Sequence, residues 1–459
     1  MFPIRPFVFS GICATLGAMA HVQANTSIPP QETAILARIK SPQFAERDFA
    51  ITDFGAANDG DSTEAIAKAI AACNAAGGGR VVIPPGEWMT GAVHLKSNVN
   101  LYLAEGATLH FNPDPAKYLP MVLTRFEGIE CMNYSPLIYA FEQENVAITG
   151  KGTLDGSASL ETWWSWNDPS KGRPTKQTTA RNRLDAEGTH GVPVAERIHG
   201  EGSFLRPAFI QPYRCKNVLI EGVKIIHSPM WEMNPVLCTN VTVRGVSVSS
   251  HGSNNDGCDP ESCKDVLIED CVFDTGDDCI AIKSGRNNDG RRIGVPSENI
   301  VIRRCTMRDG HGGVTMGSEI SGGVRNVFVS DCKMDSPHLD RAIRFKSNAV
   351  RGGVMENIFI RHVTIGRVEK AVLSIEFDYE EGAKGTEKPT LRNILLENIS
   401  CESSGRVTLA TAIPEAIIED IRFENCNFRG IRSEDLLKSA PAPAYHNVSI
   451  ERGKSGKSK

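Results

Sequence analysis

The chain has 459 residues, with 41% hydrophobic and 23% charged residues and a formal net charge of −5 at pH 7. This composition is ordinary for a soluble globular protein and allows a large buried core. The negative charge argues against a nucleic-acid binder, although a local basic patch could still bind an anion. The length alone would allow about three domains, but the repeats described below favour one.

The first residues have the pattern of a secretory signal. A positive charge at Arg5 precedes an apolar stretch from Phe7 to Ala20, and the small-residue sequence Val22–Ala24 is typical of a cleavage site. The apolar stretch is shorter than the roughly 18 residues that cross a bilayer. We therefore predict a signal peptide over residues 1–24 and a secreted or periplasmic protein without membrane association after cleavage. Residues 25–48 are expected to form an N-terminal linker.

One helix is expected near the start of the mature chain. Asp61 or Ser62 can cap an alanine-rich stretch that runs to Ala76, and three glycines at positions 77–79 end it. An uncovered edge of stacked strands would promote aggregation. We therefore predict that this helix caps one end of the strands that follow.

A short unit then recurs, consisting of an Asn or Asp followed by alternating apolar residues. Copies are separated by 23 residues from Asn217 to Asn240 and by up to 36 from Asn357 to Asn393. Short strands at a period near 27 residues predict an all-β fold, a single-domain right-handed parallel β-helix. A β-propeller would have longer, four-stranded repeats. The predicted domain spans residues 49–451 and is followed by a basic, disordered tail over 452–459. The clear copies begin at Asn217, Asn240, Asp265, Asn299, Asn326, Asn357, Asn393, Asp420 and Asn447.

The cysteines fall into this pattern. Cys271, Cys305, Cys332 and Cys426 each lie six residues after a repeat start, where other repeats have Val or Ile. Cysteine in such a column behaves as a small apolar residue, so we predict reduced thiols in the core. Cys258 and Cys263 flank a turn and could instead form a disulfide; the sequence does not decide this.

Four polar motifs recur on successive repeats. They are Asn254–Gly257, Gly276–Cys279, Gly310–Gly312 and Arg344–Lys346. When the repeats are aligned, Asp256 and Asp278 fall at one position, and Asn255, Asp277 and His311 at the position before it. Because neighbouring coils lie about 4.8 Å apart, these side chains are expected to form one cluster.

Three carboxylates this close cannot all ionise easily, so at least one should have a raised pKa. A protonated carboxyl beside ionised ones suits glycosidic bond cleavage, with one group protonating the leaving oxygen and others activating water. If water fits between acid and base at roughly 6.5–9.5 Å, the anomeric configuration inverts. Turn-forming aspartates or a calcium site are alternatives. The added histidine and cations favour catalysis, and we predict no metal.

Arg344 and Lys346 alternate along one strand and therefore point to the same face. They could neutralise the carboxylates internally, or they could bind a carboxylate of the substrate.

These four motifs, in this order on a β-helix, resemble the signature of the polygalacturonases, glycoside hydrolase family 28. The resemblance covers nearly the whole mature chain. It implies that Asp277 is the general acid and that Asp256 and Asp278 activate water, with His311 beside the acid. It also implies that the substrate is held by the remaining predicted residues, with no cofactor: Arg344, Lys346, Asn254 and Tyr379.

Two positions depart from the usual pattern, Asn255 where Thr is frequent and Phe345 where Ile is usual. Neither belongs to the acid/base set, but they leave the backbone of the substrate open. Rhamnogalacturonan and xylogalacturonan are therefore alternatives to polygalacturonate. Two other classes also remain: a calcium-dependent pectate lyase and a non-catalytic pectin-binding β-helix. In each case a pectic polymer or oligosaccharide is the expected partner, and the protein is expected to be a monomer.

The repeats are interrupted by a polar insertion over about residues 157–203. It contains Trp163, Trp164 and Trp166, which we expect to form a folded flap that stacks on sugar rings. This insertion and the stretch around Gly317–Gly323 resemble bacterial exo-acting members of the family, which implies exo action.

Overall fold

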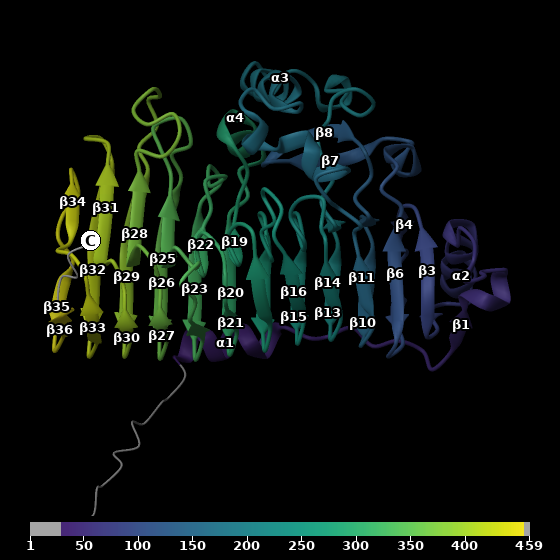
Figure 1. Cartoon of the computed structure of the whole chain (residues 1–459), viewed down its shortest axis with the longest axis horizontal. Helices are drawn as coiled ribbons and strands as arrows, with labels where there is room; N and C mark the ends of the chain where they lie inside the picture. The colour runs from purple at the N-terminus through teal and green to yellow at the C-terminus, as the bar shows by residue number, and fades with distance from the viewer. Residues whose placement is uncertain (1–28, 454–459) are drawn as a thin grey trace, which may run out of the picture.

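The computed structural model describes residues 29–453, and the chain coils into a long stack of strands (Figure 1). The predicted signal peptide over 1–24 and residues 454–459 of the predicted tail lie outside the described residues. None of the described helices is long and apolar enough to cross a membrane.

Each coil adds one strand to each of several parallel sheets, as predicted for a parallel β-helix. The 13-stranded sheet contains β1 (Asp48–Ala50), β2 (Gly79–Ile83), β5 (Val99–Leu103), β10 (Glu144–Gly150), β13 (Lys216–Glu221), β15 (Thr239–Arg244), β17 (Lys264–Glu269), β20 (Ser297–Arg303), β23 (Val324–Ser330), β26 (Val354–Arg361), β29 (Thr390–Glu397), β32 (Ile417–Glu424) and β35 (Ala444–His446). The 12-stranded sheet contains β3 (Gly86–Thr90), β6 (Ala107–Phe111), β11 (Thr153–Asp155), β14 (Lys224–Ile226), β16 (Ser247–Ser250), β18 (Val272–Thr275), β21 (Thr306–Met307), β24 (Lys333–Met334), β27 (Thr364–Arg367), β30 (Ser400–Ser403), β33 (Asn427–Ile431) and β36 (Ser449–Arg452).

The third face of the coil carries the strands that matter for the site. A three-stranded sheet contains β4 (Val93–His94), β9 (Ile138–Phe141) and β12 (Ile210–Tyr213). Isolated bridges through Met233 and Cys258 connect it to a six-stranded sheet. That sheet contains β19 (Ile280–Ile282), β22 (Val314–Met316), β25 (Arg341–Lys346), β28 (Ala371–Phe377), β31 (Arg406–Ala412) and β34 (Leu436–Lys438).

The residues that begin the repeats form a ladder of side chains, which explains their chemistry. All nine have positive φ, between 51° and 59°, a conformation that Asn and Asp tolerate better than most residues. Their amides also bond from coil to coil, as where Asn326 donates to Asn299 at 3.0 Å and Asn357 to Asn326 at 3.2 Å. The repeat in the sequence therefore marks a turn that each coil makes in the same way.

The predicted cysteine column lies in the core. Cys271, Cys305, Cys332 and Cys426 are buried among apolar residues of the main hydrophobic cluster. All twelve cysteines among the described residues are unpaired and buried, so the prediction of reduced core thiols is confirmed and Cys258 and Cys263 form no disulfide.

Helix α2 (Thr63–Ala75) lies at the N-terminal end of the stack, where the sequence predicts a capping helix. Asp61 Oδ1 accepts the Thr63 N–H at 2.9 Å, which satisfies one free donor of the first turn. The segment expected to be a linker is more ordered than that, because residues 30–38 form helix α1 (Pro30–Arg38). Ile35 of this helix and Ile39 directly after it pack against Val301 and neighbouring residues on the outside of the 13-stranded sheet.

Three segments stand above the third face of the coil (Figure 1), and we call them the cap. They are the antiparallel hairpin of β7 (Val122–Phe126) and β8 (Ile129–Asn133), helix α4 (Asn287–Ile293) and the insertion 157–203. The insertion contains η3 (Trp163–Asn167), η4 (Pro169–Lys171), α3 (Thr178–Thr189) and η5 (Val194–Glu196). The remaining short helices are η1 (Ile51–Phe54) and η2 (Pro115–Tyr118).

Candidate active site

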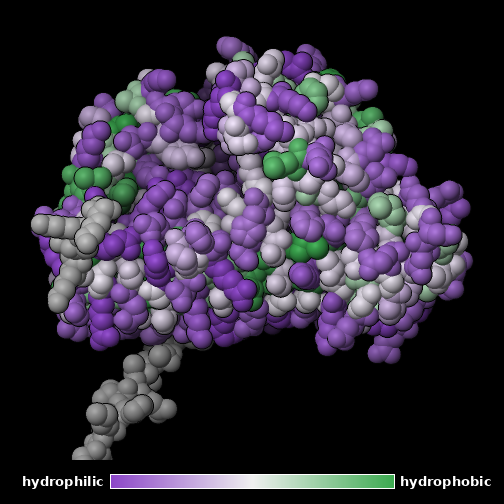
Figure 2. All heavy atoms as spheres, in the orientation of Figure 1, coloured by the Kyte–Doolittle hydropathy of each residue, from purple (hydrophilic) through white to green (hydrophobic). Residues whose placement is uncertain are grey.

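The four motifs meet in one polar pocket on the six-stranded sheet. It has a volume of about 330 Å³ and opens into a second lobe of about 650 Å³ beneath the insertion. Figure 2 shows the corresponding hollow, with hydrophilic side chains, between the cap and the loop 378–389 that follows β28. Seven of the eight predicted site residues line the pocket: Asn254, Asp256, Asp277, His311, Arg344, Lys346 and Tyr379.

The eighth, Asp278, lies beneath the pocket floor with no exposed side-chain surface. It belongs to the predicted cluster, because Asp256, Asp277 and Asp278 each place one oxygen within 4.8 Å of the others. Backbone bonds hold this stacking: Gly257 N donates to Asp278 O at 3.0 Å, and Asp277 N to Asn255 O at 3.1 Å. The oxygen distances within the cluster are shorter than the roughly 6.5–9.5 Å carboxyl separation expected for inversion, so the spacing of the cluster does not itself support that expectation.

Asp277 is the carboxylate of this cluster that is open to the pocket, with 18% of its side chain exposed. Its Oδ1 lies 2.9 Å from Nδ1 of the half-exposed His311, one coil further along. The hydrogen bond with Asp277 raises the pKa of His311 above its usual value. Asp277 and His311 thus form a pair at the pocket surface that can exchange a proton with a bound molecule.

Two cations hold Asp278 from the C-terminal side. Lys346 Nζ lies 2.8 Å from its Oδ2, and Arg344 Nη1 lies 3.4 Å from its Oδ1. Burial works against ionisation, but these cations lower the pKa of Asp278 below its usual value. Arg344 also donates twice to Glu376, at 3.0 and 2.9 Å. The predicted same-face arrangement of Arg344 and Lys346 is present, and part of their charge is used inside the protein.

The relatives of this chain agree with the geometry. A family model described as glycosyl hydrolases family 28 matches residues 181–445. The structure of a hyperthermoactive exopolygalacturonase from Thermotoga maritima is 44% identical, with a TM-score of 0.88 over 92% of this chain and 96% of that one. The chain belongs to glycosyl hydrolase family 28.

More distant relatives of this chain have related descriptions. An exo-poly-alpha-D-galacturonosidase from Dickeya chrysanthemi is 25% identical over 439 residues, which are 89% of this chain and 71% of the relative. A probable polygalacturonase from Vitis vinifera is 29% identical over 330 residues, 69% of this chain. The match spans only 60% of the length of the Vitis protein.

In this family 28 glycosidase, the pKa of Asp256 differs from that of the neighbouring Asp278, because it is raised. Burial raises its pKa to about 8, against the opposing effect of Lys283, whose Nζ lies 3.3 Å from Asp256 Oδ2. Lys283 also lies 3.3 Å from Glu319 and 4.0 Å above the ring of Trp231. The sequence predicted that one carboxylate of the cluster would have a raised pKa, and this effect falls on Asp256.

The tryptophans of the insertion do not reach the pocket, so the prediction that they stack on sugar rings is wrong. Trp163 and Trp166 are buried and pack edge-to-face at 4.8 Å. Trp164 is partly buried and donates to the carbonyl of Ser228. They pack onto the main hydrophobic core of the molecule, where Trp163 contacts Tyr118 and Trp166 contacts Tyr134. The tryptophan that does line the pocket is Trp231.

The cap covers the coils on the N-terminal side of the site. Arg125 of the β7–β8 hairpin pairs at 3.0 Å with Glu261, and neither side chain is exposed. Arg181 of α3 pairs with Glu127 at 2.6 Å and reaches Glu380 of the loop 378–389 at 3.5 Å. The insertion is therefore linked by charge to the loop on the opposite wall of the pocket.

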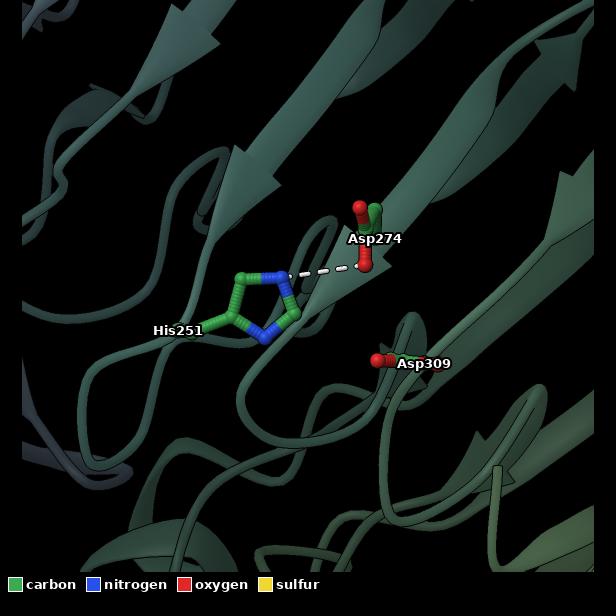
Figure 3. Close-up of side chains that lie close together, drawn as sticks. All are labelled: His251, Asp274 and Asp309. Carbon is green, nitrogen blue, oxygen red and sulfur yellow. Dashed lines mark ion pairs between the residues drawn. The ribbon is translucent and has the colours of Figure 1, made fainter. Parts of the chain in front are cut away.

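Two groups of side chains have the composition of a metal site, but their contacts are with the protein. The Asp256, Asp277 and Asp278 group is contacted by Lys283, Lys346 and Arg344. The second group, His251, Asp274 and Asp309, lies at the ends of three adjacent strands (Figure 3). His251 Nε2 pairs with Asp274 at 3.0 Å, and Ser336 donates to Asp309. We assign no ion to either group.

Sequence reasoning missed four residues that shape the site. Glu376 could have been found by extending the repeat alignment one coil, because Lys346 and Glu376 are paired in register. Lys283 could have been placed on the pocket side from its alternation with the buried Ile282. Trp231 lies between two repeats and Arg206 belongs to no recurring motif, so no signal in the sequence marks either residue.

Proposed function

We propose that this protein is an exported, exo-acting polygalacturonase that hydrolyses α-1,4-galacturonosidic bonds with inversion of configuration. The observation that carries the proposal is a pocket lined by carboxyl groups and cations, with the cap over its N-terminal side. Relatives described as an exopolygalacturonase and an exo-poly-alpha-D-galacturonosidase support it. The predicted signal sequence over residues 1–24 supports export.

The uronate carboxylate binds at Arg344 and Lys346. Lys346 has three N–H donors and Asp278 uses one, so two remain for a ligand. Tyr379 covers both cations, with its ring centre 5.7 Å from the Arg344 guanidinium and 5.3 Å from Lys346 Nζ. Arg341 and Lys370 also line the pocket and add positive charge on the same side. Three carboxylates, Asp278, Asp340 and Glu376, pair with these four cations, so positive charge is left that favours a uronate over a neutral sugar.

Asp277 protonates the glycosidic oxygen, because it faces the pocket and His311 can resupply its proton. Asp278 accepts the proton of the attacking water, because Lys346 and Arg344 keep it ionised. Asp256, which has a pKa of about 8, is protonated at neutral pH and can hold that water by a hydrogen bond. As the reaction proceeds, the carbon–oxygen bond breaks while the water oxygen bonds to the anomeric carbon.

Inversion is supported by the burial of the carboxylates behind Asp277. Asp278 has no exposed side-chain surface, and Asp256 exposes 4% of its side chain. A retaining enzyme needs a carboxylate that reaches the anomeric carbon itself. Neither buried group is placed for such an attack, whereas Asp256, which lines the pocket, can contact a water molecule.

Exo action is supported by the position of the cap. A polymer lying along the six-stranded sheet meets the β7–β8 hairpin directly beyond Asp256, where Arg125 and Glu261 are fully covered. The hairpin therefore closes the pocket beyond these coils, and the remaining open space lies beneath the insertion and toward the C-terminal coils.

The test is a time course of products from polygalacturonate with chelator present, combined with NMR of the first anomer formed. We expect monogalacturonate or digalacturonate from the earliest point, with the β-anomer first. A ladder of oligomers would contradict exo action, and the α-anomer first would contradict inversion. An unsaturated product that needs calcium would indicate a lyase. Sugar released only from rhamnogalacturonan or xylogalacturonan would show that one of these polymers is the substrate. Binding of pectin without cleavage would contradict the enzymatic function.

A further inference from the structure

Arg206 is a fully buried arginine beside the pocket, and it has no carboxylate partner. Its side chain is among the largest that are fully buried, together with Arg197 and Arg351. Arg197 pairs with Asp289, and Arg351 with Glu380 and Glu381. No carboxylate of the described residues lies within 4.0 Å of the Arg206 guanidinium. Burying such a charge is costly unless its donors are well used.

Its donors are used by neutral oxygens. Nη1 donates to the carbonyl of Pro229 at 2.9 Å and to that of Ser253 at 2.6 Å, and Nε donates to Gln177 at 3.3 Å. Nη2 donates to Oδ1 of Asn254 at 2.8 Å. Burial lowers the pKa of Arg206 to about 10, so the group stays charged at neutral pH. The guanidinium therefore contacts the pocket lining through its hydrogen bond to Asn254.

The amide of Asn254 has only one orientation that fits these neighbours. Its Oδ1 accepts from Arg206, from Asn167 Nδ2 at 3.0 Å and from Ser253 Oγ at 3.2 Å. The reversed amide would place N–H groups against the donors of Arg206, which have no acceptor to offer. The amide nitrogen therefore points away from this group of donors, and Asn254 lines both lobes of the pocket.

Asn167 ties this arrangement to the insertion. It is the last residue of η3, and besides its bond to Asn254 it donates to Ser253 Oγ at 2.9 Å. Thr175 Oγ1 in turn donates to Asn167 Oδ1 at 3.0 Å, which fixes the orientation of its amide. Thus a residue from the insertion and a buried arginine from the coil both act on the same oxygen of Asn254.

We propose that Arg206 and Asn167 are positioning residues that hold Asn254 with its amide N–H groups directed at the substrate. The substrate group that Asn254 contacts is an oxygen acceptor of the sugar, either a hydroxyl or the uronate carboxylate. This inference rests on the proposed function, because it assigns a role within that site. It also gives the insertion a direct role in substrate binding, in addition to covering the end of the pocket.

The decisive variant is Asn254→Asp, which exchanges only the amide nitrogen for an oxygen. If the nitrogen faces the substrate, this variant keeps its bond to Arg206 and gives that cation a charged partner. We expect an unchanged or higher Tm, a KM for polygalacturonate at least tenfold higher and a smaller change in kcat. Asn58→Asp, an exposed residue far from the pocket, is the matched charge control and should leave all three values unchanged.

Arg206 variants could fail to fold, so Asn167→Ala tests the positioning role separately. It removes one donor to Asn254 Oδ1 from a part-buried site, and we expect KM to rise about threefold to tenfold with kcat and Tm nearly unchanged. Wild-type enzyme is assayed in parallel. If wild type is inactive on polygalacturonate, the proposed function fails and this inference with it. If wild type is active but both variants keep KM within twofold, or lose only Tm, the positioning role is overturned while the proposed function stands.

Discussion

Asp256, Asp277 and Asp278 are chemically identical, and their surroundings give them different tasks. Asp277 faces the pocket beside His311, Asp278 is enclosed by Lys346 and Arg344, and Asp256 is buried. This division lets one cluster hold a proton and an ionised carboxylate at the same pH.

Replacing Asp277 by Asn tests the acid. We expect kcat on polygalacturonate to fall by about 10²- to 10⁴-fold, the range for a lost general acid, because Asp277 is the most exposed carboxyl of the cluster. The Tm should change little, since the amide keeps the size of the side chain. Asp274→Asn on the same coil but outside the pocket is the control. A rate near that of wild type would remove Asp277 from the acid role.

The titration of Asp256 should appear in ligand affinity. Its pKa is about 8 in the folded protein, so the group is neutral below pH 8 and negative above it. The affinity for monogalacturonate should therefore fall as the pH rises through 8, because a further negative charge joins the ionised Asp278 in the cluster. Calorimetric titration between pH 6 and pH 9 measures this.

The control for this titration is Asp256→Asn, in which the pH dependence should disappear. The same raised pKa predicts that this group favours the folded state at acid pH, and that its contribution is lost as the pH rises from about 4 to about 8. An affinity that stays constant across pH 8 in wild type would contradict the assignment.

At the residue scale, the sequence predicted the members of the site but not their individual environments. Aligning the repeats predicted that Asp256 stacks on Asp278, because residues at the same position of neighbouring coils lie next to each other. The raised pKa of Asp256 comes from its burial and is opposed by Lys283, and the repeat encodes neither effect. The tryptophans of the insertion were misassigned, because composition does not distinguish an aromatic residue that binds sugar from one that packs onto the hydrophobic core.

Among the elements, the contribution of the Asn and Asp ladder to stability can be measured by replacing one of its residues. Asn326 combines a φ of 57° with ladder bonds to Asn299 and Asn357. Asn326→Ala should lower the free energy of unfolding by about 1–3 kcal/mol, from left-handed strain and lost hydrogen bonds. Asn326→Gly should lose less, because glycine tolerates this φ. Equal losses for Ala and Gly in urea unfolding would show that the strain contributes nothing.

The link between α3 and the loop 378–389 should affect product length. In Arg181→Ala the bonds to Glu127 and Glu380 are lost, and the wall of the pocket can open. We expect longer oligomers among the products of polygalacturonate, measured by anion-exchange chromatography. Arg183→Ala on the same helix, which pairs with Glu187, should keep the wild-type products. An unchanged product pattern at a normal rate in Arg181→Ala would show that this link does not set chain length.

For the whole molecule, helix α1 joins coils that are far apart in the sequence. Glu32 pairs with Arg361 and Arg38 with Asp265, while Ile35 packs on the outside of the 13-stranded sheet. Ile35→Ala should lower the free energy of unfolding by about 2–4 kcal/mol, the usual loss for a buried Ile. The exposed Thr33→Ala should have almost no effect. A loss below about 0.5 kcal/mol would mean that α1 adds little to stability.

The β-helix itself was predictable because each coil repeats the same turn and the same inward column. Helix α2 was predictable from its cap and its terminal glycines. Helix α1 was not, because its apolar residues are few and its stability comes from the sheet that it covers. The cap was recognised only as an interruption, since its hairpin and its helices come from three separate parts of the chain.

The buried cysteines provide built-in reporters of how the coils open. Twelve thiols in the described part of the chain extend from Cys73 in helix α2 to Cys426 near the C-terminal end, and all are shielded from solvent. An alkylating reagent can label each one only after the coil, helix or hairpin that contains it has opened. The order of labelling, read by mass spectrometry of the digested protein, would therefore show at which end unfolding begins, without an added probe. In an oxidising compartment the same order would determine which thiols are first exposed to disulfide exchange.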